Sequence, residues 1–143
     1  AYEGPRGDFF LSEFEVRVPP KAARIEVAKA SESYGGKAAH SQQTSGAAAA
    51  VDGVMSTGWS TNGRQGRPEA AVFELAQPIA AGEPIVVTMR FERHFACPLG
   101  RFRISVTDSP GAGARGHTAE VEAALLKPEE ARTADERQAV MRR

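Results

Sequence analysis

Residues 48–75 read AAAVDGVMSTGWSTNGRQGRPEAAVFEL and decide how the rest of the chain is arranged. This stretch holds the single tryptophan of the chain, Trp59, an Asp-Gly turn that begins at Asp52, and a loop rich in arginine and glycine. It ends in AAVFEL, residues 70–75, where alternating apolar side chains predict a strand. Loops that a rigid scaffold positions commonly carry binding residues. We therefore expect this stretch to help hold any ligand or ion.

A first strand is predicted over residues 8–18, DFFLSEFEVRV, which alternate between two faces. Period-two alternation with aromatic and β-branched residues is typical of a half-buried strand. Glu13 and Glu15 fall on the charged face, which we expect to point to solvent. Pro19-Pro20 ends the strand, because two successive residues lack the N–H group that a ladder needs. The opposite face consists of Phe10, Ser12, Phe14, Val16 and Val18.

Further short strands are predicted over residues 23–30, 85–92 and 101–107. In the last of these, RFRISVT, apolar side chains alternate with arginine and serine and are expected to point inward. Short strands at intervals of roughly ten to fifteen residues favour an antiparallel β-sandwich over a parallel α/β sheet. The inward residues of RFRISVT are Phe102, Ile104 and Val106.

Two local patterns predict the connections around Trp59. The alanine run at residues 47–51 is expected to form one helical turn and to allow close packing, since a glycine follows so soon. Asn62-Gly63 is a strong turn signal, and the nearby Gly66 and Pro68 extend it into a longer loop. The first 110 residues are thus interpreted as one β-sandwich domain.

The end of the chain, residues 111–143, changes from strand to helix patterns. Residues 117–126 carry apolar side chains at helical spacing, and Lys127-Pro128 breaks this helix. Thr133 and Glu136 have the spacing of a capping box, which predicts the start of a last helix. We expect this helical extension to pack on the sandwich or to lead to a neighbouring domain.

Composition excludes several classes of function. The 143 residues include 18 Lys+Arg and 18 Asp+Glu, for a formal net charge of +0. Such a balance provides no long-range field for nucleic acid or an acidic membrane surface. No apolar run reaches the roughly 20 residues of a membrane helix. Residues 1–7 lack the features of a signal peptide, so we interpret the chain as a domain from a longer protein.

The sequence does not predict an enzyme. Its three histidines, His40, His94 and His117, lie outside any Gly-x-Ser-x-Gly or His-Glu-x-x-His pattern. Cys97 is the single cysteine, so the chain has neither an intramolecular disulfide nor a Cys-x-x-Cys-His haem attachment. Glu129 and Glu130 precede a predicted helix and are explained as charges at its N-terminus.

Binding is the more plausible class of function. An aromatic face stacks on the C–H bonds of a sugar while arginine and asparagine reach its hydroxyl groups. The alternative is that the tryptophan fills the core and the arginines belong to a solvated loop. Asp52 and Thr57 are candidate ligands of a structural calcium ion, which prefers oxygen donors from a curved loop; the alternative is a simple turn. The candidate sugar-binding residues are Trp59, Asn62, Arg64 and Arg67.

Four segments together resemble a known module: GDFFLSEFEV, AAVDGVMSTGWS, AAVFELAQPI and LGRFRISVT. They are similar to the sandwich module of large planctomycete proteins that also carry c-type cytochrome domains, over residues 7–108. RTADERQAV resembles the helical segment that follows that module. The spacing A-x-DG-x(3)-TGW is also similar to the discoidin, or factor V/VIII type C, class of galactose-binding-like domains.

The resemblance implies a jelly-roll β-sandwich with any ligand site in loops at one end. It also implies carbohydrate (glycan or polysaccharide) binding, a structural calcium near the Asp-Gly loop, and export to the periplasm or the cell exterior. We therefore expect a non-catalytic carbohydrate-binding module of a larger multidomain protein, without haem in this part. The alternative is a structural domain that orients neighbouring cytochrome c-type domains, which the scarcity of aromatic residues favours.

Overall fold

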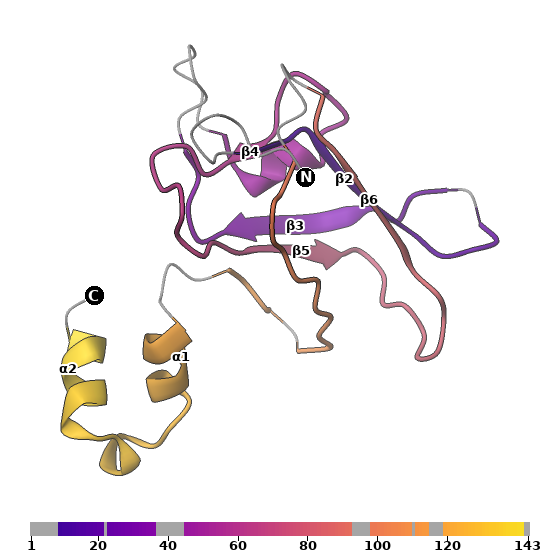
Figure 1. Cartoon of the computed structure of the whole chain (residues 1–143). Helices are drawn as coiled ribbons and strands as arrows, with labels where there is room; N and C mark the ends of the chain where they lie inside the picture. Colours follow the sequence, from indigo (N-terminus) through magenta and orange to yellow (C-terminus); the bar gives the residue numbers. More distant parts are fainter. Residues whose placement is uncertain are drawn as a thin grey trace.

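The computed structural model describes residues 9–21, 23–36, 45–92, 98–109, 111–114 and 119–141. Within these residues the strands form three antiparallel sheets of two strands each, followed by two short helices (Figure 1). The antiparallel, β-rich architecture expected from the sequence is confirmed. The pairs are β1 (Phe10–Leu11) with β4 (Trp59–Ser60), β2 (Glu13–Arg17) with β6 (Val86–Arg90), and β3 (Val27–Glu32) with β5 (Ala71–Leu75).

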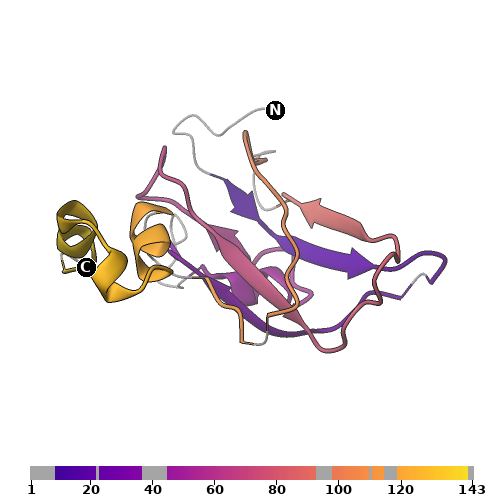
Figure 2. The same cartoon turned by 90° about the horizontal axis from the view of Figure 1, so that it is seen from below.

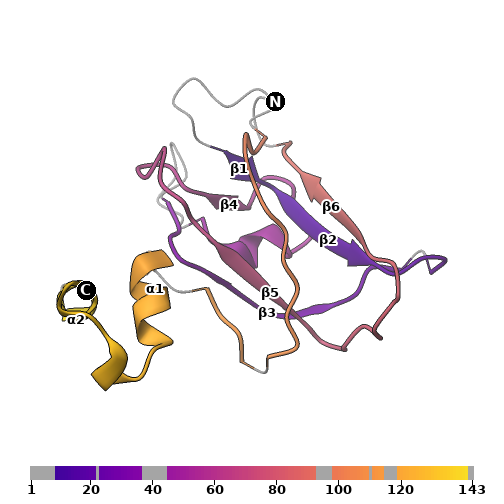
Figure 3. The same cartoon turned by 60° about the horizontal axis from the view of Figure 1, so that its bottom comes forward.

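The core lies where these pairs meet, around Leu11, Ala50 and Trp59. Ala50 belongs to the helical turn η1 (Ala47–Ala50), which contacts strands of all three sheets. The predicted turn is confirmed, and its small side chains let the backbone approach the strands closely. Phe14 of β2 stacks on Phe73 of β5 with ring centroids 4.0 Å apart, which joins two of the sheets. Figure 3 shows η1 between the strand pairs.

The predicted solvent face of β2 is wrong. Glu13 and Glu15 are buried, and so is Ser12, the residue before β2. Both sides of this strand are covered, because the loop at Gly53 closes over Glu13 while two arginines close over Glu15. Alternation identified the strand correctly, but it did not reveal that a distant loop covers the charged face.

The predicted strand at residues 101–107 is also wrong. Residues 102–109 are assigned to no strand, and residues 101–109 are exposed. Figures 1 and 2 show this part of the chain as a stretched segment that runs across the strands before the chain turns back toward the helices. Alternation describes which side chains share a face, but a strand also needs a neighbouring strand to bond to, and none of the described strands pairs with it. The strand predicted over residues 23–30 is shifted and begins at Val27.

The two helices predicted at the end of the chain are present. They are α1 (Ala119–Leu125) and α2 (Ala134–Met141), linked by the turn η2 (Glu129–Ala131), and they lie to one side of the sheets (Figure 1). The capping box is present, because the Thr133 N–H donates to Glu136 Oε2 at 2.9 Å and the Glu136 N–H donates to Thr133 Oγ1 at 3.2 Å. Neither described helix has the length and apolar character needed to span a bilayer.

Candidate functional site

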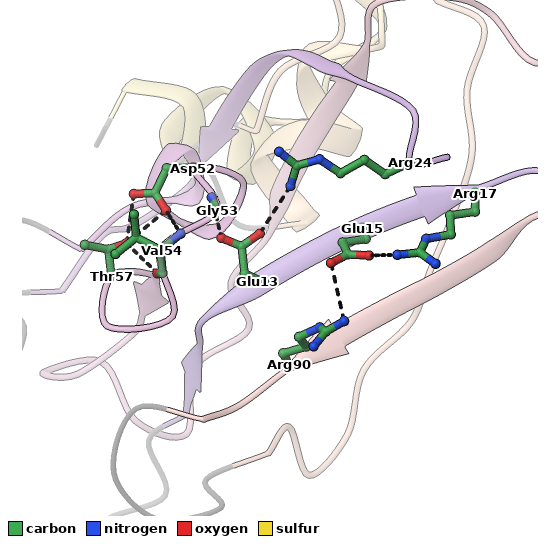
Figure 4. A network of polar contacts seen from close by, with 9 residues as sticks. All are labelled: Glu13, Glu15, Arg17, Arg24, Asp52, Gly53, Val54, Thr57 and Arg90. Carbon is green, nitrogen blue, oxygen red and sulfur yellow. Dashed lines mark hydrogen bonds and ion pairs between the residues drawn. The ribbon is translucent and has the colours of Figure 1, made fainter. Parts of the chain in front are cut away.

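The Asp-Gly turn forms a closed corner over residues 52–57 (Figure 4). The Val54 N–H donates to Asp52 Oδ1 at 2.8 Å. The Thr57 hydroxyl lies 2.8 Å from Asp52 Oδ2 and 2.8 Å from the Val54 carbonyl oxygen. Gly53 has a φ of 82°, a value that favours glycine at this turn. Asp52 and Thr57, the two predicted metal ligands, therefore face each other within one small loop.

Glu13 attaches this corner to β2. The Gly53 N–H donates to Glu13 Oε1 at 2.6 Å, and the glutamate is only 1% exposed. The other oxygen, Oε2, has Arg24 Nη1 at 3.9 Å and accepts no hydrogen bond within the described part of the chain. Burial raises the pKa of Glu13, and the charges of Asp52 and Glu15 add to the rise, against the Gly53 hydrogen bond and Arg24.

Glu15, two residues along β2, is held differently. Its carboxylate lies 2.7 Å from Arg17 and 3.6 Å from Arg90, an arginine on the paired strand β6 (Figure 4). Both arginines are partly exposed, so their charges remain hydrated while they cover the glutamate. This pair of contacts is explained by the packing of β2 against β6.

Trp59 lies beneath the loop that follows the corner. The residue is 6% exposed, and its indole N–H donates to the Tyr34 carbonyl oxygen at 2.8 Å. The indole meets Phe9 edge-on, with ring centroids 5.0 Å apart. The indole therefore fills the core beside Leu11, and the surface it offers to a ligand is small.

Tyr34 is the aromatic residue that the structure brings to the loop. Its hydroxyl donates to the Asn62 carbonyl oxygen at 3.0 Å, and the Arg64 guanidinium lies 4.5 Å from its ring centroid. Arg64 also lies 3.3 Å from Glu69, whose carboxylate accepts a hydrogen bond from the Ser33 hydroxyl. Tyr34 and Glu69 were not among the predicted site residues. Tyr34 is 28 positions from Asn62 in the sequence, and no local pattern links the two.

The predicted binding residues therefore separate into three places. Asn62 and Arg64 gather around Tyr34 at the surface of the loop, and Gln65 supports Asn62 through a 3.0 Å side-chain hydrogen bond. Trp59 lies below them in the core. Arg67 is exposed three residues further along the loop, where its backbone N–H donates to the Arg64 carbonyl oxygen. We name the group Tyr34, Asn62, Arg64 and Glu69 the Tyr34 cluster.

Metal-ligating side chains form no cluster in the described part of the chain. No three His, Cys, Asp or Glu side chains there are grouped so that they could hold a metal ion. His40, His94, His117 and Cys97 lie outside the described residues. No protein-family model, curated protein or solved structure matches this chain.

Proposed function

We propose that this chain is a non-catalytic carbohydrate-binding module of the jelly-roll type, within a larger exported protein. The observation that carries the proposal is the Tyr34 cluster, in which an aromatic ring, an arginine, a carboxylate and the backbone carbonyl of Asn62 meet at one loop. Sugar sites combine an apolar face with a few fixed polar groups of both donor and acceptor type. The resemblance to galactose-binding-like modules supports the same class of ligand and a periplasmic or extracellular location.

The polar groups of the Tyr34 cluster are held in place before any ligand arrives. Glu69 is nearly covered, and both of its oxygens have protein partners, the Ser33 hydroxyl and Arg64. The Arg64 side chain is 41% exposed, so part of its guanidinium fork remains open to a ligand. Neighbouring sugar hydroxyl groups accept from such a fork, and a side chain already held by its partners loses less entropy on binding.

Replacing Arg64 with alanine is expected to weaken glycan binding at least about tenfold, the effect of losing roughly 1.4 kcal/mol of contact energy. Arg67→Ala should have a smaller effect, because the exposed Arg67 side chain makes no hydrogen bond or ion pair with the Tyr34 cluster among the described residues. Arg137→Ala on α2 is the matched control, because Arg137 is an exposed arginine remote from the loop. A glycan array followed by affinity electrophoresis against plant and algal polysaccharides measures the change. No bound glycan, or equal binding by all three variants, contradicts the proposal.

The helical extension favours a second function, that of a structural domain that orients neighbouring domains, such as cytochrome c-type domains, without a small ligand. Leu126, just after α1, and Met141, at the end of α2, are large apolar side chains left exposed. The helices lie beside the sheets, and the Ala114 N–H reaches back to Ser31 of β3 at 2.9 Å. Exposed apolar residues on such an extension suit contact with another domain. Absence of glycan binding, together with intact folding, favours this function over the first.

We further propose that the corner holds a structural calcium ion through Asp52 and Thr57. The Thr57 hydroxyl has one proton for two acceptors. If it donates to the Val54 carbonyl oxygen, lone pairs of Thr57 Oγ1 and of the Asp52 carboxylate remain free and face each other. Thr57 Oγ1 lies 3.0 Å from Asp52 Oδ1 and 2.8 Å from Asp52 Oδ2. Adjacent oxygens of a carboxylate and a hydroxyl are donors that Ca²⁺ accepts. The fit supports the proposal and requires further oxygens, from water or backbone, to complete the coordination.

Excess Ca²⁺ is expected to raise the melting temperature by several degrees over EDTA, because an ion that binds only the folded chain stabilises it by mass action. At a free concentration about 100 times its dissociation constant the gain is roughly 2.7 kcal/mol. Asp52→Asn keeps the acceptor for the Val54 N–H but removes the charge, so it should abolish the difference. Identical wild-type melting curves in Ca²⁺ and EDTA rule out the ion.

A further inference from the structure

Residues 101–107, RFRISVT, have the alternation of a strand but no strand partner among the described residues. Their backbone N–H and C=O groups make no hydrogen bond within the described part of the chain. Phe102, Ile104 and Val106 leave 55%, 49% and 80% of their surfaces exposed. An exposed apolar segment with unpaired backbone groups is a template on which another strand can pair.

We propose that this segment is an interaction surface on which two copies of the chain pair, strand against strand. The two segments run antiparallel about a two-fold axis at Ile104. An extended backbone with open donors and acceptors selects another extended backbone as its partner. A two-fold interface uses the same residues on both copies, so it needs a sequence that is complementary to itself.

The sequence of the segment meets this requirement. In the antiparallel register each arginine faces a neutral hydroxyl residue, and the apolar residues face each other. A parallel, in-register pair would instead place each arginine beside its own copy, and like charges at that position are destabilising. The formal net charge of +0 adds no long-range repulsion between two copies. The opposed residues are Arg101 with Thr107, Phe102 with Val106, Arg103 with Ser105, and Ile104 with Ile104.

The expected dimer is weak. Two paired segments of seven residues bury less surface than the roughly 1,200 Å² at the lower end of stable interfaces. Association should therefore depend on concentration and appear at micromolar levels or above. The apolar face of Phe102, Ile104 and Val106 is continuous along one side of the segment, so pairing brings six apolar side chains onto one shared face.

Disulfide trapping tests both the pairing and its register. The variants are made with Cys97→Ser, because Cys97 is the only native thiol. Ile104→Cys faces its own copy at about 4.5–5.5 Å between Cβ atoms and should oxidise to a covalent dimer at least tenfold faster than Phe102→Cys. In the Phe102→Cys homodimer the two thiols are offset by four residues, or roughly 13 Å. Mixing Phe102→Cys with Val106→Cys should restore rapid cross-linking.

Val86→Cys is the matched control, since Val86 is also an exposed apolar residue of a strand-forming segment. Sedimentation velocity over a concentration series should show the wild-type chain dimerising, while Ile104→Lys, which opposes two lysines, stays monomeric with an unchanged melting temperature. A wild-type chain that remains monomeric up to millimolar concentration overturns the proposal. Equal oxidation rates for Ile104→Cys, Phe102→Cys and Val86→Cys do so as well.

Discussion

Trp59→Ala is expected to remove about 3–5 kcal/mol from the free energy of unfolding, the usual cost of deleting a large aromatic side chain from a core. The indole is one of the largest side chains of the core and contacts residues that join β1 to η1. Since single domains are stable by about 5–15 kcal/mol, the variant should be largely unfolded or melt far below the wild type. Chemical denaturation followed by circular dichroism measures the loss.

Trp59→Phe separates a core role from a ligand role. Phenylalanine keeps most of the apolar volume and loses the 2.8 Å hydrogen bond to the Tyr34 carbonyl oxygen, so it should cost about 1–3 kcal/mol and remain folded. We expect its glycan affinity to stay near that of the wild type, because the indole is buried. A folded Trp59→Phe variant that loses glycan binding would instead place Trp59 in direct contact with the sugar.

Glu13→Gln is expected to stabilise the chain at pH 7 and to have little effect at pH 4. Burial raises the pKa of Glu13 above its ordinary value of 4.5, so the folded chain binds its proton more tightly than the unfolded chain. The contribution of this group to stability is therefore complete below pH 4.5 and is lost as the pH rises through the folded pKa. Glutamine imitates the protonated form at every pH and still accepts the Gly53 N–H.

Thermal melts of wild type and Glu13→Gln between pH 4 and pH 7 measure this effect. The glutamine variant should melt at a higher temperature than the wild type at pH 7, and the difference should shrink as the pH falls toward 4. Glu136→Gln is the control of opposite sign, because Lys127 and the Thr133 N–H lower the pKa of Glu136. A constant difference between Glu13→Gln and wild type across this pH range contradicts a raised pKa for Glu13.

The Glu13 and calcium predictions concern the same corner and are linked through the charge of Asp52, which raises the pKa of Glu13 and would be neutralised by a bound ion. Glu13 holds the corner through the Gly53 N–H, whereas the calcium proposal uses the oxygens of Asp52 and Thr57 on the exposed side of the loop. The pH experiment is therefore performed in EDTA. A calcium effect that persists in Glu13→Gln shows that the ion requires only the exposed side.

Local patterns in the sequence predicted most of the described elements. Alternation located β2, β5 and β6, the alanine run located η1, and the capping box located the start of α2. These signals depend on residues within a few positions of each other, where backbone geometry fixes which side chains share a face. The Asp-Gly corner is equally local, because Asp52 binds groups two and five residues ahead.

The sequence by itself determined these local elements, and only the tertiary structure decided their surroundings. Burial of Glu13 depends on Gly53, 40 positions away, and Glu69 of the Tyr34 cluster is held by Ser33, 36 positions away. Residues 101–107 are a second case in which the local pattern did not predict the surroundings, since their strand-like alternation has no paired strand in the described part of the chain. The physical reason is that burial and strand pairing are properties of two segments brought together by folding, whereas a pattern along one segment specifies only its own faces.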